Sequence, residues 1–433
     1  MRTLLLSATS LSPVAVSSRH KVAGDVPGTL QYLPGSAIRG ALATNFVRAG
    51  GDEKKDEFLR LFLSDEVRFG NLYPGKNGKP LPLTAWTCKL RPGFTHDHGH
   101  GVWDLLLALA AKRVFGRDIN APVCRKSHAR SDQRGSGDDQ VELERYTGFY
   151  SYNRETRTYN RETRTWRKSG TDTRILARTS ICSPLGTAKY GQLYSLEALE
   201  EGQLFWGYIY CRDDVESKLQ SLFFPERRSD GQEGRLLFLG TARNRGLGKV
   251  KLLELSYAEG VNLYGRNPAD LSDRLQTFNE NLRSHAVESD KKTYFSLTLD
   301  SDVILQDDLL RYMSYLDPRA MREDLRSRTG KDHEWLERVE LVLQVSSTRR
   351  LSGWNEKHGL PKDEALAVSM GSVFLYRYDG GDDETLVSGL QELEKEGLGQ
   401  RRNEGFGYVC VCDPFHIQFC GGEGVPCVNA GRG

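Results

Sequence analysis

Apolar residues in the first half of the chain alternate between strand-like runs and helical spacing. Residues 3–16 read as an opening strand, and after a polar loop Ile38, Leu42 and Phe46 recur at the spacing of one helix face. Further along, the pattern predicts a run of strands at residues 178–211 and a helix at 215–223. Two strands joined by a hairpin-like connection follow at 236–239 and 249–255.

The second half repeats this outline. It predicts a strand, helical segments near Leu309 and Trp335, a second strand and a further helix, with the regular elements at residues 293–299, 373–378 and 384–396. We therefore predict an α+β fold of two ferredoxin-like (RRM-like, βαββαβ) units. The expected units are residues 1–257, with an insertion at 88–130 and a basic arm at 146–178, and residues 258–433, ending in a Cys- and Gly-rich tail.

Two glycine-rich loops each precede a strand near the end of a predicted unit. Arg243, Asn244, Gly246, Gly248 and Val250 align without gaps with Arg402, Asn403, Gly405, Gly407 and Val409, which are identical at five of eight positions and lie 159 residues further on. We name residues 243–249 the first glycine loop and residues 401–407 the second glycine loop. A nucleotide-binding P-loop does not fit, because Val250 stands where that motif needs Ser or Thr. Glycines and cations instead favour close approach to a phosphodiester backbone, against the alternative of a tight turn with solvated charges.

Composition limits where such a site can lie. The 433 residues are 38% hydrophobic and 27% charged with a formal net charge of +2, so any nucleic-acid site must be a local cluster of Arg and Lys. The chain has no apolar run of 18 residues, which predicts no membrane span. The opening stretch "MRTLLLSATSLSPVAV" breaks into Ser and Thr, so a first strand is favoured over a signal peptide. Eight scattered cysteines favour reduced thiols and a cytoplasmic protein.

The predicted first helix offers a second place for phosphate. Ser36 is the expected N-cap, and Arg39 lies in the first turn. Free N–H groups at a helix N-terminus beside a cation attract phosphate, although a plain amphipathic helix with a serine cap explains the same residues.

A basic arm follows at residues 146–178, where the heptad YNRETRT occurs twice in tandem at 152–158 and 159–165. Residues 150–178 carry eight Arg or Lys against three acids, interleaved with aromatic residues. Aromatic rings stack on bases while arginines hold phosphates, so we predict contact with single-stranded RNA, against the alternative of a solvated loop. The candidate residues are Tyr152, Arg154, Tyr159, Arg161 and Trp166.

The insertion holds more metal-binding side chains than a tetrahedral site needs. The candidates for a structural zinc are Cys88, His96, His98, His100, Cys124 and His128. No Cys-x-x-Cys spacing occurs in this segment, so scattered surface histidines remain the alternative.

The pairing of "YLPGSAIRGALA" with "RNRGLGKV" and "RRNEGFGYV" resembles the RAMP superfamily of CRISPR effector subunits. The stretches "GTAKYGQLYSLEALEEGQLFWGYI" and "SGWNEKHGLPKDEALAVSMGSVFLY" are most similar to the type III-D subunit called Csx-ten, of the Cas-five-like group. The resemblance implies a non-catalytic protein that caps a type III ribonucleoprotein and holds the 5′ handle of the CRISPR RNA in antiviral defence. It also implies contacts with backbone RAMP subunits and the large signalling subunit, with target RNA nearby.

By position, the resemblance implies that Ser36, Arg39 and the two glycine loops line the RNA. The RNA-facing residues would be Arg243, Asn244, Arg245, Gly246, Gly248, Lys249, Arg401, Arg402, Asn403, Gly405 and Gly407. Glycine and cation at a strand junction suit phosphate contact better than base readout.

Two enzyme hypotheses compete with this scaffold. Asp25 lies in the loop where target-cleaving RAMP subunits carry an aspartate, and His20 lies where guide-processing RAMP nucleases carry a histidine. Neither has a visible set of partner residues, so we expect no catalysis. A free-standing RNA-binding module is a third hypothesis.

Overall fold

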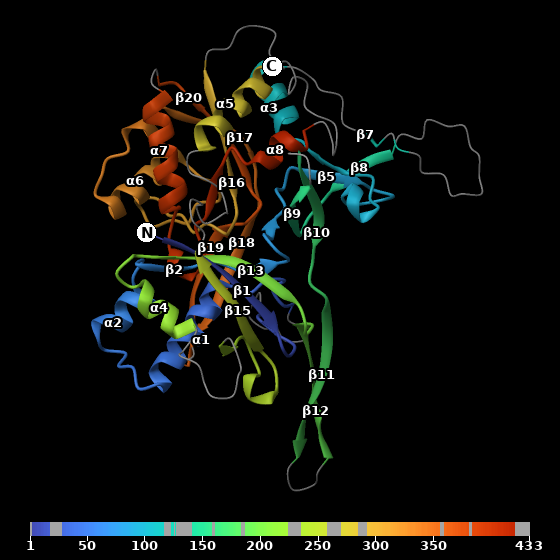
Figure 1. Cartoon of the computed structure of the whole chain (residues 1–433), viewed down its shortest axis with the longest axis vertical. Coiled ribbons are helices and arrows are strands. Elements are labelled where there is room, and N and C mark those ends of the chain that lie inside the picture. The colour runs from blue at the N-terminus through green and yellow to red at the C-terminus, as the bar shows by residue number, and fades with distance from the viewer. Residues whose placement is uncertain are drawn as a thin grey trace, which may run out of the picture.

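The computed structural model of the chain (Figure 1) describes residues 2–17, 28–116, 123–124, 126, 141–157, 161–182, 187–223, 235–257, 270–284, 292–355, 359–380 and 383–420. It is a mixed α/β structure of antiparallel sheets, with helices packed on two larger sheets. This agrees with the predicted α+β class.

The first large sheet is built around β1 (Arg2–Ser10), in which Leu4, Leu6 and Ala8 alternate with residues of the other face. Its strand order is β14-β15-β1-β13-β2, with β3 (Tyr73–Pro74) pairing β13 outside this path. The other strands are β2 (Val67–Phe69), β13 (Leu204–Cys211), β14 (Leu236–Phe238) and β15 (Lys249–Tyr257). The helices α1 (Gly35–Arg48) and α4 (Glu216–Phe223) contribute to the same hydrophobic core. The short helices α2 (Asp56–Phe58) and η1 (Leu59–Leu63) follow α1 in the chain and precede β2.

The second large sheet has the strand order β17-β20-β16-β21. Its strands are β16 (Thr293–Leu299), β17 (Val339–Val345), β20 (Val373–Tyr378) and β21 (Val409–Val411). Its core is shared with α3 (Leu106–Phe115), α5 (Asp270–Arg283), α6 (Pro318–Thr329), η4 (Glu334–Arg338) and α7 (Asp383–Glu396). β1 and β16 hold corresponding places, since each lies between two antiparallel neighbours inside its sheet.

Two local predictions are corrected. No helix forms near Leu309, which is exposed beside Leu310 at a φ of 60°. The helix of this region is α6, where Asp317 accepts hydrogen bonds from the N–H groups of Arg319 and Ala320. Ser36 is not an N-cap, because α1 begins at Gly35 behind Pro34 and has no side-chain cap.

Two long hairpins extend from the first half. β11 (Thr173–Cys182) pairs with β12 (Thr187–Leu199), and this hairpin runs away from the body at the lower right of Figure 1. β9 (Phe149–Arg157) pairs with β10 (Arg161–Ser169) and with β4 (Lys79–Pro80). The tandem heptads therefore pair with each other, with Arg154 opposite Arg164 and Arg157 opposite Arg161. A third hairpin joins β18 (Thr348–Asn355) to β19 (Leu360–Val368).

The predicted insertion forms a small sheet of its own, in the order β6-β5-β8-β7. Its strands are β5 (Ala85–Cys88), β6 (Val102–Asp104), β7 (Val123–Cys124) and β8 (Val141–Arg145), and η2 (Thr95–Asp97) lies between β5 and β6. Ala85, Phe94 and Val102 join a hydrophobic cluster with Phe415 and Phe419 around α8 (Pro414–Gln418). The insertion is thus anchored to the C-terminal end of the described chain.

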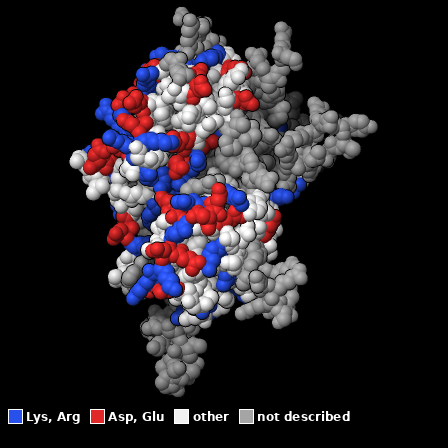
Figure 2. All heavy atoms as spheres, turned by 60° about the vertical axis from the view of Figure 1, so that its left-hand side comes forward, with Lys and Arg blue, Asp and Glu red and all other residues white. Residues whose placement is uncertain are grey.

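Acidic and basic side chains are mixed over the face shown in Figure 2, as the small net charge predicts. In the described part of the chain, no helix has the length and apolar character needed to cross a membrane. Among the described residues, the cysteines outside any disulfide are Cys88, Cys124, Cys211, Cys410 and Cys412. Cys420 is disulfide-bonded, which departs from the expected set of reduced thiols.

Candidate nucleic-acid interface and metal-ligand cluster

The two glycine loops have the same backbone shape. Each holds a single turn of 3₁₀-helix, at Arg243–Arg245 and Arg402–Glu404. Left-handed residues recur at corresponding positions, with φ of 56° and 57° at Ala242 and Arg401, 83° and 97° at Gly246 and Gly405, and 80° and 86° at Gly248 and Gly407. The matched glycines therefore reflect matched conformation.

A matched hydrogen bond closes each loop. The N–H of Leu239 donates to the carbonyl of Gly248, and the N–H of Leu398 donates to that of Gly407, both at 2.8 Å. A Cβ on Gly248 would lie 2.0 Å from the Leu239 carbonyl oxygen. Only glycine fits this position, because the strand carbonyl lies against its backbone.

The first glycine loop is open on its outer side. Asn244, Arg245 and Gly246 are exposed, while Leu247 is buried against Leu196 and Ala198 at the base of the β11–β12 hairpin. Arg178 of β11 donates to the Arg245 carbonyl at 3.4 Å, and the Arg245 guanidinium donates to the Tyr194 hydroxyl at 2.5 Å. The first glycine loop and the hairpin are thus joined through Arg178, Arg245 and Tyr194, although the sequence patterns had assigned them to separate features.

The second glycine loop is enclosed. Glu404, 8% exposed, takes the place that Arg245 holds in the first glycine loop. Its carboxylate accepts from Arg39 at 2.6 Å, from Lys362 at 3.0 Å and from Arg401 at 2.5 Å. Burial acts to raise the pKa of Glu404, but Arg39, Arg401 and Lys362 outweigh it and lower the pKa to about 2.

Other residues of the second glycine loop dock on the first sheet. Arg402 is 5% exposed and pairs with Asp65, and Asn403 donates to the Leu63 carbonyl at 3.2 Å. The carbonyl of Gly405 accepts from the Asn71 side chain at 3.1 Å. These contacts make the second glycine loop less exposed than the first, and its contact with RNA stays a prediction.

Two other predicted RNA contacts are also placed differently. The Arg39 guanidinium is mostly buried between Glu404 and the Phe62 carbonyl, so its hydrogen bonds serve the contact between the sheets. Trp166 is 8% exposed and packs against Tyr150 and Phe419, so its ring cannot stack on a base. Aromatic content alone could not distinguish a buried ring from an exposed one.

Several candidates lie outside the described part of the structure. They are the side chains of Tyr152, Arg154 and Arg161, and the whole of Tyr159, His20, Asp25 and His128.

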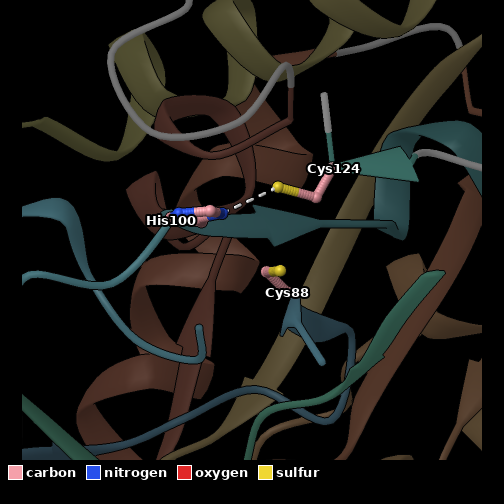
Figure 3. A group of neighbouring side chains, drawn as sticks. All are labelled: Cys88, His100 and Cys124. Carbon is pink, nitrogen blue, oxygen red and sulfur yellow. Dashed lines mark hydrogen bonds between the residues drawn. The ribbon is translucent and has the colours of Figure 1, made fainter. Parts of the chain in front are cut away.

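Half of the proposed metal ligands come together. Cys88, His100 and Cys124 are all buried, and their ligand atoms lie within 4.8 Å of one another (Figure 3). The Nδ1 atom of His100 is 3.3 Å from the Sγ atom of Cys124. His96 and His98 are exposed and lie outside this group, and His96 contacts Arg167 instead. The two nearest histidines to His100 in sequence are therefore removed from the candidate set.

Sequence reasoning missed Arg178, Tyr194, Lys362 and Glu404. The signal for Glu404 was present, because it reverses the charge found at Arg245 in an otherwise matched loop.

Comparison with known proteins supplies the family. The model of the RAMP superfamily matches residues 7–251. A chain of a type III-B Cmr-beta complex bound to cognate target RNA is 11% identical, with 90% of this chain and 94% of that chain covered and a TM-score of 0.36. A Thermus thermophilus Cas6 chain is 11% identical, with 48% and 74% covered and a TM-score of 0.29. No curated protein sequence matches the chain. The structural likeness at these TM-scores is not used to assign the family. The family match spans more than half of the 433 residues, and the chain therefore belongs to the RAMP superfamily.

Proposed function

We propose that this protein is a CRISPR RNA-binding subunit of a type III effector ribonucleoprotein, and that it holds its guide through phosphate contacts. Membership of the RAMP superfamily supports the class of function. The observation that carries the RNA-binding role is the open first glycine loop lying against the β11–β12 hairpin.

Charge pairing favours the first glycine loop over the second as the RNA contact. Among the described residues, no acidic side chain forms an ion pair with Arg178, Arg245 or Lys249. In the second glycine loop, Arg401 and Arg402 are each paired with an acidic residue. An unpaired guanidinium gains more from a phosphate than one that must first leave a carboxylate.

The architecture supports the finer assignment within this proposal. In the second large sheet, the central strand β16 is followed by α6, the strands β17 and β20, α7, the second glycine loop and β21. The first large sheet follows the same order from β1 to β15, with β3 added before β13 and β14 added between α4 and the first glycine loop. We infer two ferredoxin-like units, residues 1–257 and 258–433, and we propose that the protein is the type III-D subunit that its sequence resembles. On this proposal the protein caps a cytoplasmic complex, holds the 5′ handle and contacts the backbone and large signalling subunits.

The role is proposed to be non-catalytic. Aligning an attacking oxygen with a phosphodiester requires fixed acid, base or metal groups, and the sequence offers only the isolated candidates Asp25 and His20. We expect Asp25→Ala and His20→Ala to leave guide maturation and target cleavage by the assembled complex nearly unchanged. Loss of one specific cut with Asp25→Ala, at unchanged guide content, would make this a target-cleaving subunit.

The deciding experiment is purification of the full chain together with the proteins encoded beside it, followed by sequencing of the bound nucleic acid. The proposal expects RNA of one population with a shared 5′ end. Replacing Arg245 and Lys249 by Ala should lower the amount of RNA retained while the subunits still assemble. Heterogeneous RNA, or none, from a stable assembly would contradict the proposed function.

A further inference from the structure

We propose that Cys88, His100 and Cys124 bind a zinc ion that fixes the inserted sheet. The three side chains supply two thiolates and one imidazole, which are the ligand types that structural zinc sites use. This site is independent of the RNA-binding proposal, because none of its residues belongs to the first glycine loop or the β11–β12 hairpin.

Strand register places the two thiols on one face of the small sheet. Cys88 of β5 is opposite Leu143 of β8, and Cys124 of β7 is opposite Val141 of the same strand. Residues two apart on a strand share a face, and paired residues share it too. Both thiols therefore lie on one face of the sheet. Figure 3 shows the Cys124 sulfur turned toward the His100 ring, and the Cys88 sulfur lies within 4.8 Å of both ligand atoms.

A tight loop brings His100 back to this face. The N–H of Gly101 donates to the Gly93 carbonyl and the N–H of His100 to the Arg91 carbonyl, both at 2.9 Å. The Thr87 hydroxyl, next to Cys88, accepts from the Gly93 N–H at 2.8 Å and donates to the Gly101 carbonyl at 3.0 Å. Thr87, the neighbour of Cys88, thus holds the loop that carries His100.

The two cysteines are fully buried, and His100 beside them is 7% exposed. A lone buried cysteine is explained by packing, and Cys410 is another that is buried outside the hydrophobic clusters. Two buried thiols gathered around a buried imidazole are instead a ligand set for a metal ion.

A disulfide between Cys88 and Cys124 fits the fold poorly. β8 lies between β5 and β7 in the sheet order, and neighbouring strands are about 4.8 Å apart. The two backbones are therefore farther apart than the about 7 Å that a disulfide spans. A metal ion bridges the larger gap, because each zinc–sulfur bond adds about 2.3 Å.

A cross-link would stabilise the small sheet, because its strands are short and its apolar core is small. Its strands β6 and β7 have three and two residues, and the apolar cluster it shares with α8 includes only Ala85, Phe94 and Val102 from residues 85–104. Small sheets with little core commonly depend on a metal or disulfides. Zinc at this site would join β5, the loop before β6, and β7.

The test measures metal on the full chain, expressed and purified without added chelator. We expect close to one equivalent of zinc per chain by elemental mass spectrometry. After replacement by Co²⁺, we expect the absorption bands of a tetrahedral, thiolate-bound ion. A folded wild type that carries less than about a tenth of an equivalent and takes up no Co²⁺, or that holds a Cys88–Cys124 disulfide, would overturn the proposal.

Variants locate the ion. Cys88→Ser, Cys124→Ser and His100→Ala should each lower zinc content at least fivefold, and the cysteine variants should also lose the thiolate–cobalt band. The matched controls His96→Ala and His98→Ala should retain the wild-type content. Retention of zinc in all three ligand variants would contradict the assignment. Where a variant does not fold, removing zinc from the wild type should increase hydrogen exchange in β5 and β8 while β16 and β20 stay protected, and unchanged exchange would contradict the site.

Discussion

Arg245 and Glu404 occupy the same position in two loops of matching backbone shape, and their opposite charges accompany opposite surroundings. Arg245 is exposed beside the β11–β12 hairpin, whereas Glu404 is buried among Arg39, Arg401 and Lys362. A single charge reversal thus separates a loop open to solvent from a loop that joins the two sheets.

Charge removal in the first glycine loop should weaken RNA binding in a salt-dependent way. For Arg245→Ala combined with Lys249→Ala, we expect the slope of log K against log salt to fall in magnitude by about one for each lost phosphate contact. Fluorescence anisotropy with guide RNA across a KCl titration measures this slope. The control is Arg326→Ala, which removes a side chain on α6 that is 56% exposed. This substitution should leave the slope unchanged. An unaltered slope in the double variant would exclude these residues as phosphate contacts.

Glu404→Gln should destabilise the contact between the sheets. It leaves Arg39, Arg401 and Lys362 close together without their shared carboxylate, which we expect to cost about 3 kcal/mol of unfolding free energy. Urea denaturation followed by tryptophan fluorescence reports the change. Glu340→Gln, which removes a 60% exposed partner of Arg377, should cost less than about 1 kcal/mol. If the two substitutions lowered the free energy of unfolding equally, burial of Glu404 would not strengthen the contribution of its ion pairs to stability.

The contribution of Glu404 should depend on pH in acid. Its pKa is lowered from 4.5 to about 2 in the folded protein, so the unfolded state binds its proton first as pH falls. The stabilisation is complete above about pH 4.5 and is lost as pH falls toward 2. The difference in stability between wild type and Glu404→Gln, measured from pH 6 to pH 2.5, should therefore be constant at first and then shrink. A difference in stability that grows as the pH falls below 4 would contradict the lowered pKa of Glu404.

Gly246 and Gly405 form a matched pair for testing the docked loop. Both have positive φ, but a Cβ on Gly246 would meet nothing within 4 Å, whereas one on Gly405 would lie 2.5 Å from the Asn71 Oδ1 atom. Gly246→Ala should cost about 1 kcal/mol for backbone strain alone. Gly405→Ala should cost about 2 kcal/mol more, because the side chain of Asn71 must move. Thermal unfolding of the two variants makes the comparison, and equal shifts would mean that the Asn71 contact is readily displaced.

Elements with strong apolar periodicity were predictable from the sequence. The predicted strands at 293–299 and 373–378 coincide with β16 and β20, and the helix at 384–396 differs from α7 by one residue. α6 was missed because its exposed face is rich in Arg, although Asp317 followed by Pro318 is a typical helix start.

The shape of the glycine loops was predictable, but their surroundings were not. Five identical positions specify a backbone conformation, since glycine is selected locally by positive φ. Whether a loop is exposed depends on residues far away, and Arg39 lies 365 positions before Glu404. The same reason explains why the sequence could not show that Cys88, His100 and Cys124 come together while His96 and His98 lie apart from them.

The self-pairing heptads give the β9–β10 hairpin an adjustable reach. Because the two copies pair with each other strand against strand, two further heptads would add seven residues to each strand, or about 23 Å of length at about 3.3 Å per residue. Such growth leaves the pairing of β9 with β4 unchanged. The number of heptads therefore sets the span of this hairpin without any change to the two sheets.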